Sequence, residues 1–155
     1  VLSVFGADES AEQLRAEGDD YSAILLKTAS TRLAEAAAEE LHLRMAREIW
    51  GFGPDVPQGK QSCAACPGIR PAPGYPTLPD HSLKREIFQL LDAEHAVGTR
   101  LTESFMMIPQ PSVCALVIAN PAARYFPVGK VQEDQLKEYA VRRGFDLETM
   151  RRLIS

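Results

Sequence analysis

The chain has 155 residues, 45% of them hydrophobic and 25% charged, which is the composition of a single folded domain. Its formal net charge of −4 argues against nucleic acid or an anionic membrane surface as a partner. No apolar run approaches the roughly 20 residues that a membrane-spanning helix needs, and no signal-peptide pattern is present. Three cysteines, an odd number, fit a reducing cytoplasm better than a disulfide framework.

Two helices are predicted in the N-terminal third of the chain. A short β-prone run, residues 1–5, precedes a helix over residues 7–17. Asp19 or Asp20 can then cap a long helix over residues 21–49. Apolar side chains recur along this helix at three- and four-residue spacing, which predicts a stripe packed into the core. The stripe comprises Leu26, Ala29, Leu33, Ala37, Leu41, Met45 and Ile49.

A proline-rich segment follows the long helix, and five of the 11 prolines lie between Pro67 and Pro79. Each proline fixes its own φ, removes a backbone donor and biases the preceding residue toward extended geometry. Residues 68–81, the proline-rich strip, are therefore expected to be extended. Such a strip suits ligand binding, since its free backbone groups are ordered before a ligand arrives. A rigid linker of polyproline type is the other interpretation.

The C-terminal half mixes helices and strands without a regular βαβ alternation, which favours the α+β class. The sequence predicts helices over residues 82–93, 132–143 and 147–153, and strands over residues 101–107, 113–118 and 125–128.

Two cysteines, Cys63 and Cys66, have the spacing of a metal or redox site. A zinc site normally needs four ligands, and the only other cysteine is Cys114. No HExxH, GxSxG, GxxxxGK[ST] or GxGxxG pattern is present. The sequence therefore predicts no metal ligands and no catalytic residues.

Two further positions have both a structural and a functional interpretation. Glu35 lies off the apolar stripe and can be a solvated carboxylate near Arg32. Tyr125 and Phe126 follow Arg124 at the start of a predicted strand, where an edge strand with alternating exposure is the simpler interpretation.

Six segments in the same order resemble the activation domain of cobalamin-dependent methionine synthase. The most specific is the strip, Gly-Ile-Arg-Pro-Ala-Pro-Gly-Tyr-Pro. The resemblance covers nearly the whole chain and is carried by residues 19–24 with 32–36, 50–52, 68–76, 101–105, 123–130 and 135–144. One departure is Thr31, which stands where the family usually has Asp.

The resemblance implies a fold, a function and partners. The fold is a twisted antiparallel sheet with flanking helices, and residues 1–155 form one activation domain, the C-terminal portion of the family's domain. The function is reductive reactivation: the domain binds S-adenosylmethionine and presents its methyl group to cobalamin held by a partner domain. A flavodoxin-type protein supplies the electron. The chain is then part of a cytoplasmic methyltransferase and is not catalytic alone.

The resemblance also implies a binding site for S-adenosylmethionine. Arg70 can hold its carboxylate in bidentate fashion, and Glu35 and Tyr125 favour its cationic end. The backbone of Ala72, Gly74 and Tyr75 bonds the adenine and ribose, and Phe126 lines the pocket. The alternative is a stand-alone relative that uses the fold to bind another ligand or a partner protein.

Overall fold

The computed structural model describes residues 1–52 and 68–154. Helices dominate these residues, and the strands are short and antiparallel, so the predicted α+β class is confirmed. In chain order the elements are β1 (Leu2–Ser3), α1 (Ala7–Ala16), α2 (Asp20–Arg44), η1 (Met45–Ile49), α3 (Leu83–Leu91), α4 (Ala93–Val97), β2 (Arg100–Leu101), β3 (Met107–Ile108), β4 (Ser112–Val113), α5 (Glu133–Arg143) and α6 (Leu147–Leu153). None of the described helices is long and apolar enough to cross a bilayer.

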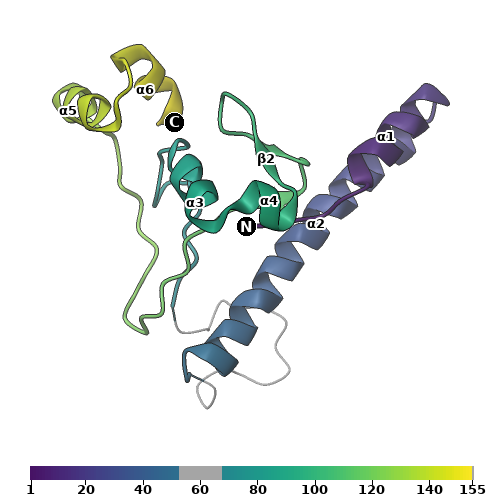
Figure 1. Cartoon of the computed structure of the whole chain (residues 1–155), viewed down its shortest axis with the longest axis horizontal. Coiled ribbons are helices and arrows are strands. Elements are labelled where there is room, and N and C mark those ends of the chain that lie inside the picture. Colours follow the sequence, from purple (N-terminus) through teal and green to yellow (C-terminus); the bar gives the residue numbers. More distant parts are fainter. Residues whose placement is uncertain (53–67, 155) are drawn as a thin grey trace.

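The long predicted helix is α2, which continues into the π-helical turn η1 and forms the spine of the molecule (Figure 1). Asp19 caps it, because its carboxylate accepts a hydrogen bond from the Ser22 N–H. The prediction that the apolar stripe packs into the core is wrong. Leu33, Leu41 and Ile49 are 57%, 45% and 73% exposed.

The buried face of α2 is instead a neighbouring row of mostly small side chains at four-residue spacing. Its members are Ser30, Ala34, Ala38 and His42, and Ala46 continues the row into η1. Both rows repeat at helical spacing, so periodicity alone cannot decide between them. The small side chains are the buried ones because they allow extended chain to approach the helix backbone closely.

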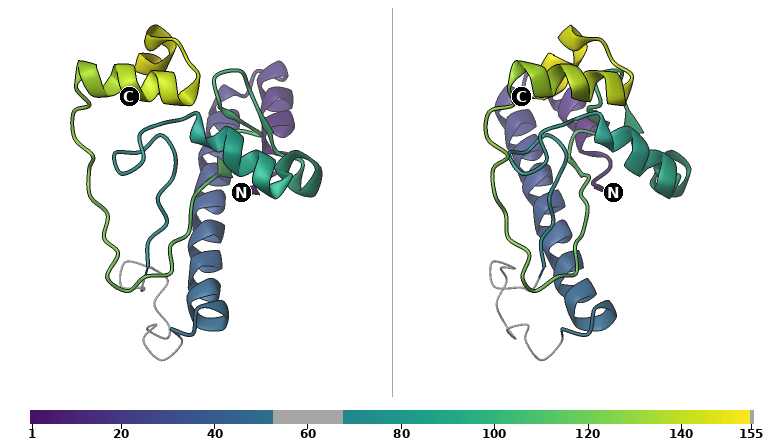
Figure 2. Two further views of the ribbon diagram at one scale, coloured as in Figure 1. Left: turned by 60° about the vertical axis from the view of Figure 1, so that its left-hand side comes forward. Right: turned by 90° about the vertical axis from the view of Figure 1, so that its left-hand side faces the viewer.

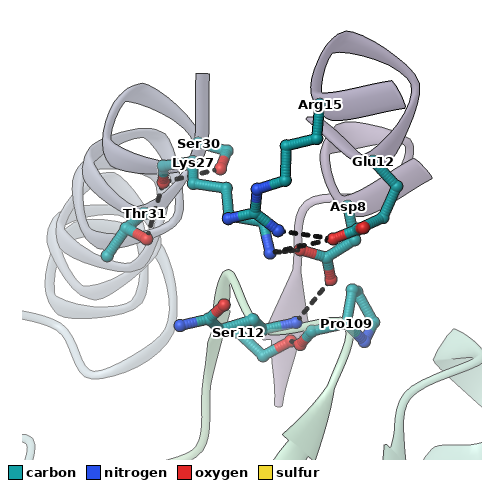
Figure 3. A network of polar contacts seen from close by, with 9 residues as sticks. Asp8, Glu12, Arg15, Lys27, Ser30, Thr31, Pro109 and Ser112 are labelled. Carbon is teal, nitrogen blue, oxygen red and sulfur yellow. Dashed lines mark hydrogen bonds and ion pairs between the residues drawn. The ribbon is translucent and has the colours of Figure 1, made fainter. Parts of the chain in front are cut away.

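Helix α1 lies against the N-terminal half of α2 (Figure 1), and a polar network fixes this pair (Figure 3). Lys27 Nζ on α2 lies 3.7 Å from Asp8 Oδ1 and 3.9 Å from Glu12 Oε1 on α1. Asp8 Oδ2 also accepts a 3.0 Å hydrogen bond from the N–H of Gln110. The network therefore joins α1, α2 and the segment between β3 and β4.

The strands form two separate pairs, β1 with β4 and β2 with β3, with Leu2 opposite Val113 and Leu101 opposite Met107. The prediction of a single strand over residues 101–107 is wrong, because these residues form a hairpin. The Thr102 N–H donates to the Met106 carbonyl, and the Thr102 hydroxyl oxygen accepts from the Met106 N–H. Of the strand predicted over residues 113–118, only the first residue belongs to β4.

Extended chain without regular strands completes the middle of the molecule. Figure 2 shows the proline-rich strip and residues 114–131 as extended chain, with the later part of residues 114–131 lying away from α2 in the left-hand view. The strand predicted over residues 125–128 is absent, and these residues are exposed. Pro127 has no N–H to donate to a ladder, which is the physical reason.

Helices α5 and α6 match the sequence prediction and close the chain at one end of the molecule (Figures 1 and 2). Arg143 of α5 forms ion pairs with Asp80 at 3.2 Å and with Glu86 at 3.0 Å. Asp80 is only 3% exposed and also accepts a 2.7 Å hydrogen bond from the Tyr139 hydroxyl. Burial and this bond raise the pKa of Tyr139 to about 12. The C-terminal end of the strip is thereby tied to α5.

Candidate ligand-binding cleft

A cleft of about 910 Å³ lies between α2, the proline-rich strip, the start of α3, the segment from β3 to β4, and residues 125–127. Binding sites for small molecules usually measure about 300–1,000 Å³. The cleft is lined by six of the seven residues that the sequence singled out: Glu35, Arg70, Ala72, Tyr75, Tyr125 and Phe126. The seventh, Gly74, lies in the strip between two of them.

The strip is extended over residues 69–72, as predicted, but it turns at residues 73–77, and main-chain hydrogen bonds hold it at both ends. Ile69 and Ile118 exchange both of their N–H···O=C bonds, at 3.2 and 2.9 Å. The Leu116 N–H donates to the Pro71 carbonyl at 2.9 Å, and the His81 N–H donates to the Leu153 carbonyl at 3.0 Å. The strip is therefore fixed between residues 116–118 and α6.

A tight turn in the strip carries the cleft-lining Tyr75. The Gly74 N–H donates to the Leu78 carbonyl and the Leu78 N–H to the Tyr75 carbonyl, both at 2.8 Å. Gly74 has a φ of +95°, and a Cβ added there would lie 2.2 Å from Cε1 of His81. The position is thus reserved for glycine by both its backbone conformation and the imidazole beneath it.

Arg70 connects three parts of the cleft. Its guanidinium donates to the carbonyl of Ala38 on α2. Its main-chain N–H donates to the hydroxyl oxygen of Tyr125 at 2.6 Å. A guanidinium has five N–H donors, so the bond to Ala38 leaves others for a ligand. Arg70 can therefore hold the cleft together and still offer positive charge inside it.

Glu35 projects from α2 at the edge of the cleft, where its side chain is 55% exposed. Its carboxylate accepts a 3.0 Å hydrogen bond from the Arg32 guanidinium one turn away. An exposed pair of this kind contributes little to stability. Glu35 is consequently free to exchange Arg32 for a cationic group of a ligand.

Tyr125 and Phe126 form the opposite wall of the cleft and are 59% and 62% exposed. They belong to residues 119–130, which we call the aromatic segment. Beyond the Tyr125 hydroxyl bond, this segment meets the strip through the Val128 N–H, which donates to the Pro76 carbonyl at 2.9 Å. The wall is therefore held mainly by the strip that it faces.

The sequence reasoning missed His81 and Lys84, which also line the cleft. Lys84 is 6% exposed, and its amine lies 3.0 Å from Nδ1 of His81. Burial lowers the pKa of both groups, and the Lys84 charge lowers that of His81 further. The available signal was their three-residue spacing directly after the strip, where the first turn of a helix places both on one side.

The described residues offer no evident metal site or nucleophile. No group of three or more potential metal ligands occurs among residues 1–52 and 68–154. Cys63 and Cys66 lie outside the described residues. Cys114 is a buried free cysteine, and burial raises the pKa of its thiol, which keeps it protonated.

Two comparisons with known proteins show the family to which this chain belongs. Residues 1–144 match the family model described as the activation domain of vitamin B12 dependent methionine synthase. A crystal structure of the MetH reactivation domain bound to AdoHcy superposes with a TM-score of 0.86 and is 39% identical in sequence. The match covers 95% of this chain and 46% of the other, so this chain spans about half of that length. The chain belongs to the family of vitamin B12-dependent methionine synthase activation domains.

Proposed function

We propose that this chain binds S-adenosylmethionine and positions its methyl group for the reductive remethylation of cob(II)alamin in a methionine synthase. The observation that supports this most strongly is the cleft that these residues share. Residues from α2, the strip and the aromatic segment, far apart in the sequence, line it together. Its volume of about 910 Å³ suits a nucleoside-bearing amino acid. The crystal structure of the similar MetH reactivation domain has AdoHcy bound.

Each charged group of the ligand is bound by cleft residues that complement its charge. Arg70 binds the carboxylate through guanidinium donors not used by Ala38. Glu35 and the ring of Tyr125 face the cationic part, since a carboxylate and an aromatic face both stabilise positive charge. Phe126 covers the pocket from the same side.

The turn of the strip recognises the nucleoside. Among the described residues, no group accepts a hydrogen bond from the N–H of Ala72. That donor, the Tyr75 backbone and the side-chain-free surface of Gly74 suit the edges of adenine and ribose. Because the turn is already hydrogen-bonded, little ordering is needed when the ligand binds.

Cobalamin, held by a partner domain, supplies the centre that accepts the methyl group. A flavodoxin-type donor in the cytoplasm supplies the electron, and S-adenosylhomocysteine is the product left in the cleft. This chain contributes binding and orientation, which are sufficient for a transfer that needs no protein acid or base. Its partners are therefore the cobalamin-binding domain and the electron donor.

Calorimetric titration with S-adenosylmethionine tests the proposal. The native chain should bind, and Arg70→Ala should weaken binding by about 10- to 100-fold through the loss of charged hydrogen bonds. Arg100→Ala, an exposed arginine outside the cleft, is the matched control and should bind as the native chain does. No binding by the native chain would contradict the function. Equal binding by Arg70→Ala would contradict the site.

A further inference from the structure

The cleft contains a buried lysine that has no acidic partner in the part of the chain that the structure describes. Lys84 lies in the first turn of α3 and is 6% exposed. Its amine has one hydrogen-bonding neighbour, Nδ1 of His81 at 3.0 Å. None of the carboxylates in the described residues lies within ion-pair distance of it. Lys84 is therefore buried without a negative partner among residues 1–52 and 68–154.

Such an arrangement is unfavourable in the isolated chain. A lysine is almost never fully buried unless its charge is paired, and burial of an unpaired ammonium lowers its pKa, as it does for Lys84. The neighbouring Cys114 thiol stays neutral, since burial raises its pKa. Lys84 lines the cleft, so an anionic group of a ligand can supply the negative charge that the described residues lack.

His81 fixes where this ammonium lies. A charged Lys84 has only donors, so Nδ1 of His81 is the acceptor and the imidazole is neutral. The ring lies directly beneath Gly74, where an added Cβ would be 2.2 Å from Cε1. Lys84 is thereby held at a set position in the lining of the cleft.

We propose that Lys84 is a carboxylate-binding residue of the cleft, positioned by His81, that contacts the amino-acid carboxylate of the S-adenosyl ligand. This inference rests on the proposed function. It adds a second cation to Arg70, whose guanidinium is already bonded to Ala38. Lys84 also has donors that no carbonyl of the described residues accepts. A carboxylate beside Lys84 also points the sulfonium away from this positive charge, so the site sets the direction in which the ligand lies.

The test compares two ligands that differ only in the carboxylate. S-adenosylhomocysteine and its decarboxylated analogue are titrated into the native chain, Lys84→Met and Lys84→Gln. Both variants should lose about 10- to 100-fold in affinity for S-adenosylhomocysteine and none for the decarboxylated analogue. Lys137→Met, an exposed lysine on α5 away from the cleft, should change neither affinity.

The outcomes separate this inference from the proposed function. Lys84→Met should be at least as stable as the native chain, because it removes an unpaired buried charge while keeping the length of the side chain. If the native chain binds S-adenosylhomocysteine and both Lys84→Met and Lys84→Gln bind it equally well, the role of Lys84 is overturned but the proposed function is not. An equal loss for both ligands would overturn it too, since that pattern indicates a general change of the cleft. No binding by the native chain would overturn the proposed function and this inference together.

Discussion

The two walls of the cleft differ in how they are held. The proline-rich strip is bonded to residues 116–118 on one side and to α6 on the other, and its turn rests on His81. The aromatic segment is exposed almost throughout, and its described bonds to the rest of the cleft both end on the strip. The strip is thus held in place by the rest of the fold, whereas the aromatic segment is held in place by the strip.

This difference indicates a division of labour in binding. Backbone groups that are fixed before the ligand arrives can select its shape at little entropic cost. Tyr125 and Phe126, more than half exposed, can close over the ligand afterwards. We therefore expect changes in the strip to affect both stability and binding, and changes in the aromatic segment to affect mainly binding.

The largest effect should follow from cutting the anchor of the strip at its C-terminal end. Asp80→Ala leaves the Arg143 guanidinium and the Tyr139 hydroxyl without their buried partner, and should lower the free energy of unfolding by about 3–5 kcal/mol. Urea denaturation measures this. Glu133→Ala breaks only an exposed pair with Arg151 and should cost less than about 1 kcal/mol. Equal losses would contradict the anchoring role.

A methyl group in the turn should have the next largest effect. Gly74→Ala places a Cβ 2.2 Å from the His81 ring at a φ of +95°, and should destabilise the fold by about 2–3 kcal/mol. Gly129→Ala in the aromatic segment is the control, since its φ is +80° but nothing lies within 4 Å of the added Cβ. It should show backbone strain alone, about 1 kcal/mol. Similar values for the two variants would contradict the tight packing of the turn on His81.

Removing one hydroxyl tests the link between the walls. Tyr125→Phe deletes the acceptor of the Arg70 N–H bond and, at this exposed position, should change the unfolding free energy by less than about 1 kcal/mol. The affinity for S-adenosylmethionine should fall by a few-fold, because the aromatic wall is then less well placed. Calorimetry and urea denaturation of the same variant separate the two effects. A large loss of stability in Tyr125→Phe with unchanged affinity would contradict the expectation that the aromatic segment affects mainly binding.

Mild acid should weaken the support beneath the turn by a small amount. Burial and the Lys84 charge lower the pKa of His81, while Asp80 opposes them. The unfolded chain therefore takes up the proton first, so the contribution of His81 to stability is lost as pH falls from about 6.5 toward the lower folded-state pKa. The stability difference between the native chain and His81→Gln should shrink over this range.

Much of the framework follows from local sequence signals. Asp19 caps α2 and Gly144 closes α5 because both signals act within a few residues. The buried side of α2 could not be predicted, since the row through Leu33 and the row through Ala34 have the same period. The packing of extended chain onto α2 decides between them, and no local pattern encodes it.

The candidate site shows the same division. The extended strip was predictable because proline limits the backbone at each of its positions. The convergence of Glu35, Arg70 and Tyr125 came from family resemblance rather than from spacing. The pairing of Asp80 with Arg143 had no sequence signal, because it depends on where α5 comes to lie.

Hydrogen–deuterium exchange with and without S-adenosylhomocysteine tests the account most directly. The amides of Ile69, Gly74 and Leu78, which are hydrogen-bonded in the strip, should be protected before the ligand is added. Those of Tyr125 and Phe126 should exchange rapidly in the free chain and slow down on binding. Strip amides that exchange freely until the ligand is present would contradict a strip that is ordered before binding. An aromatic segment whose exchange the ligand leaves unchanged would contradict its ordering on binding.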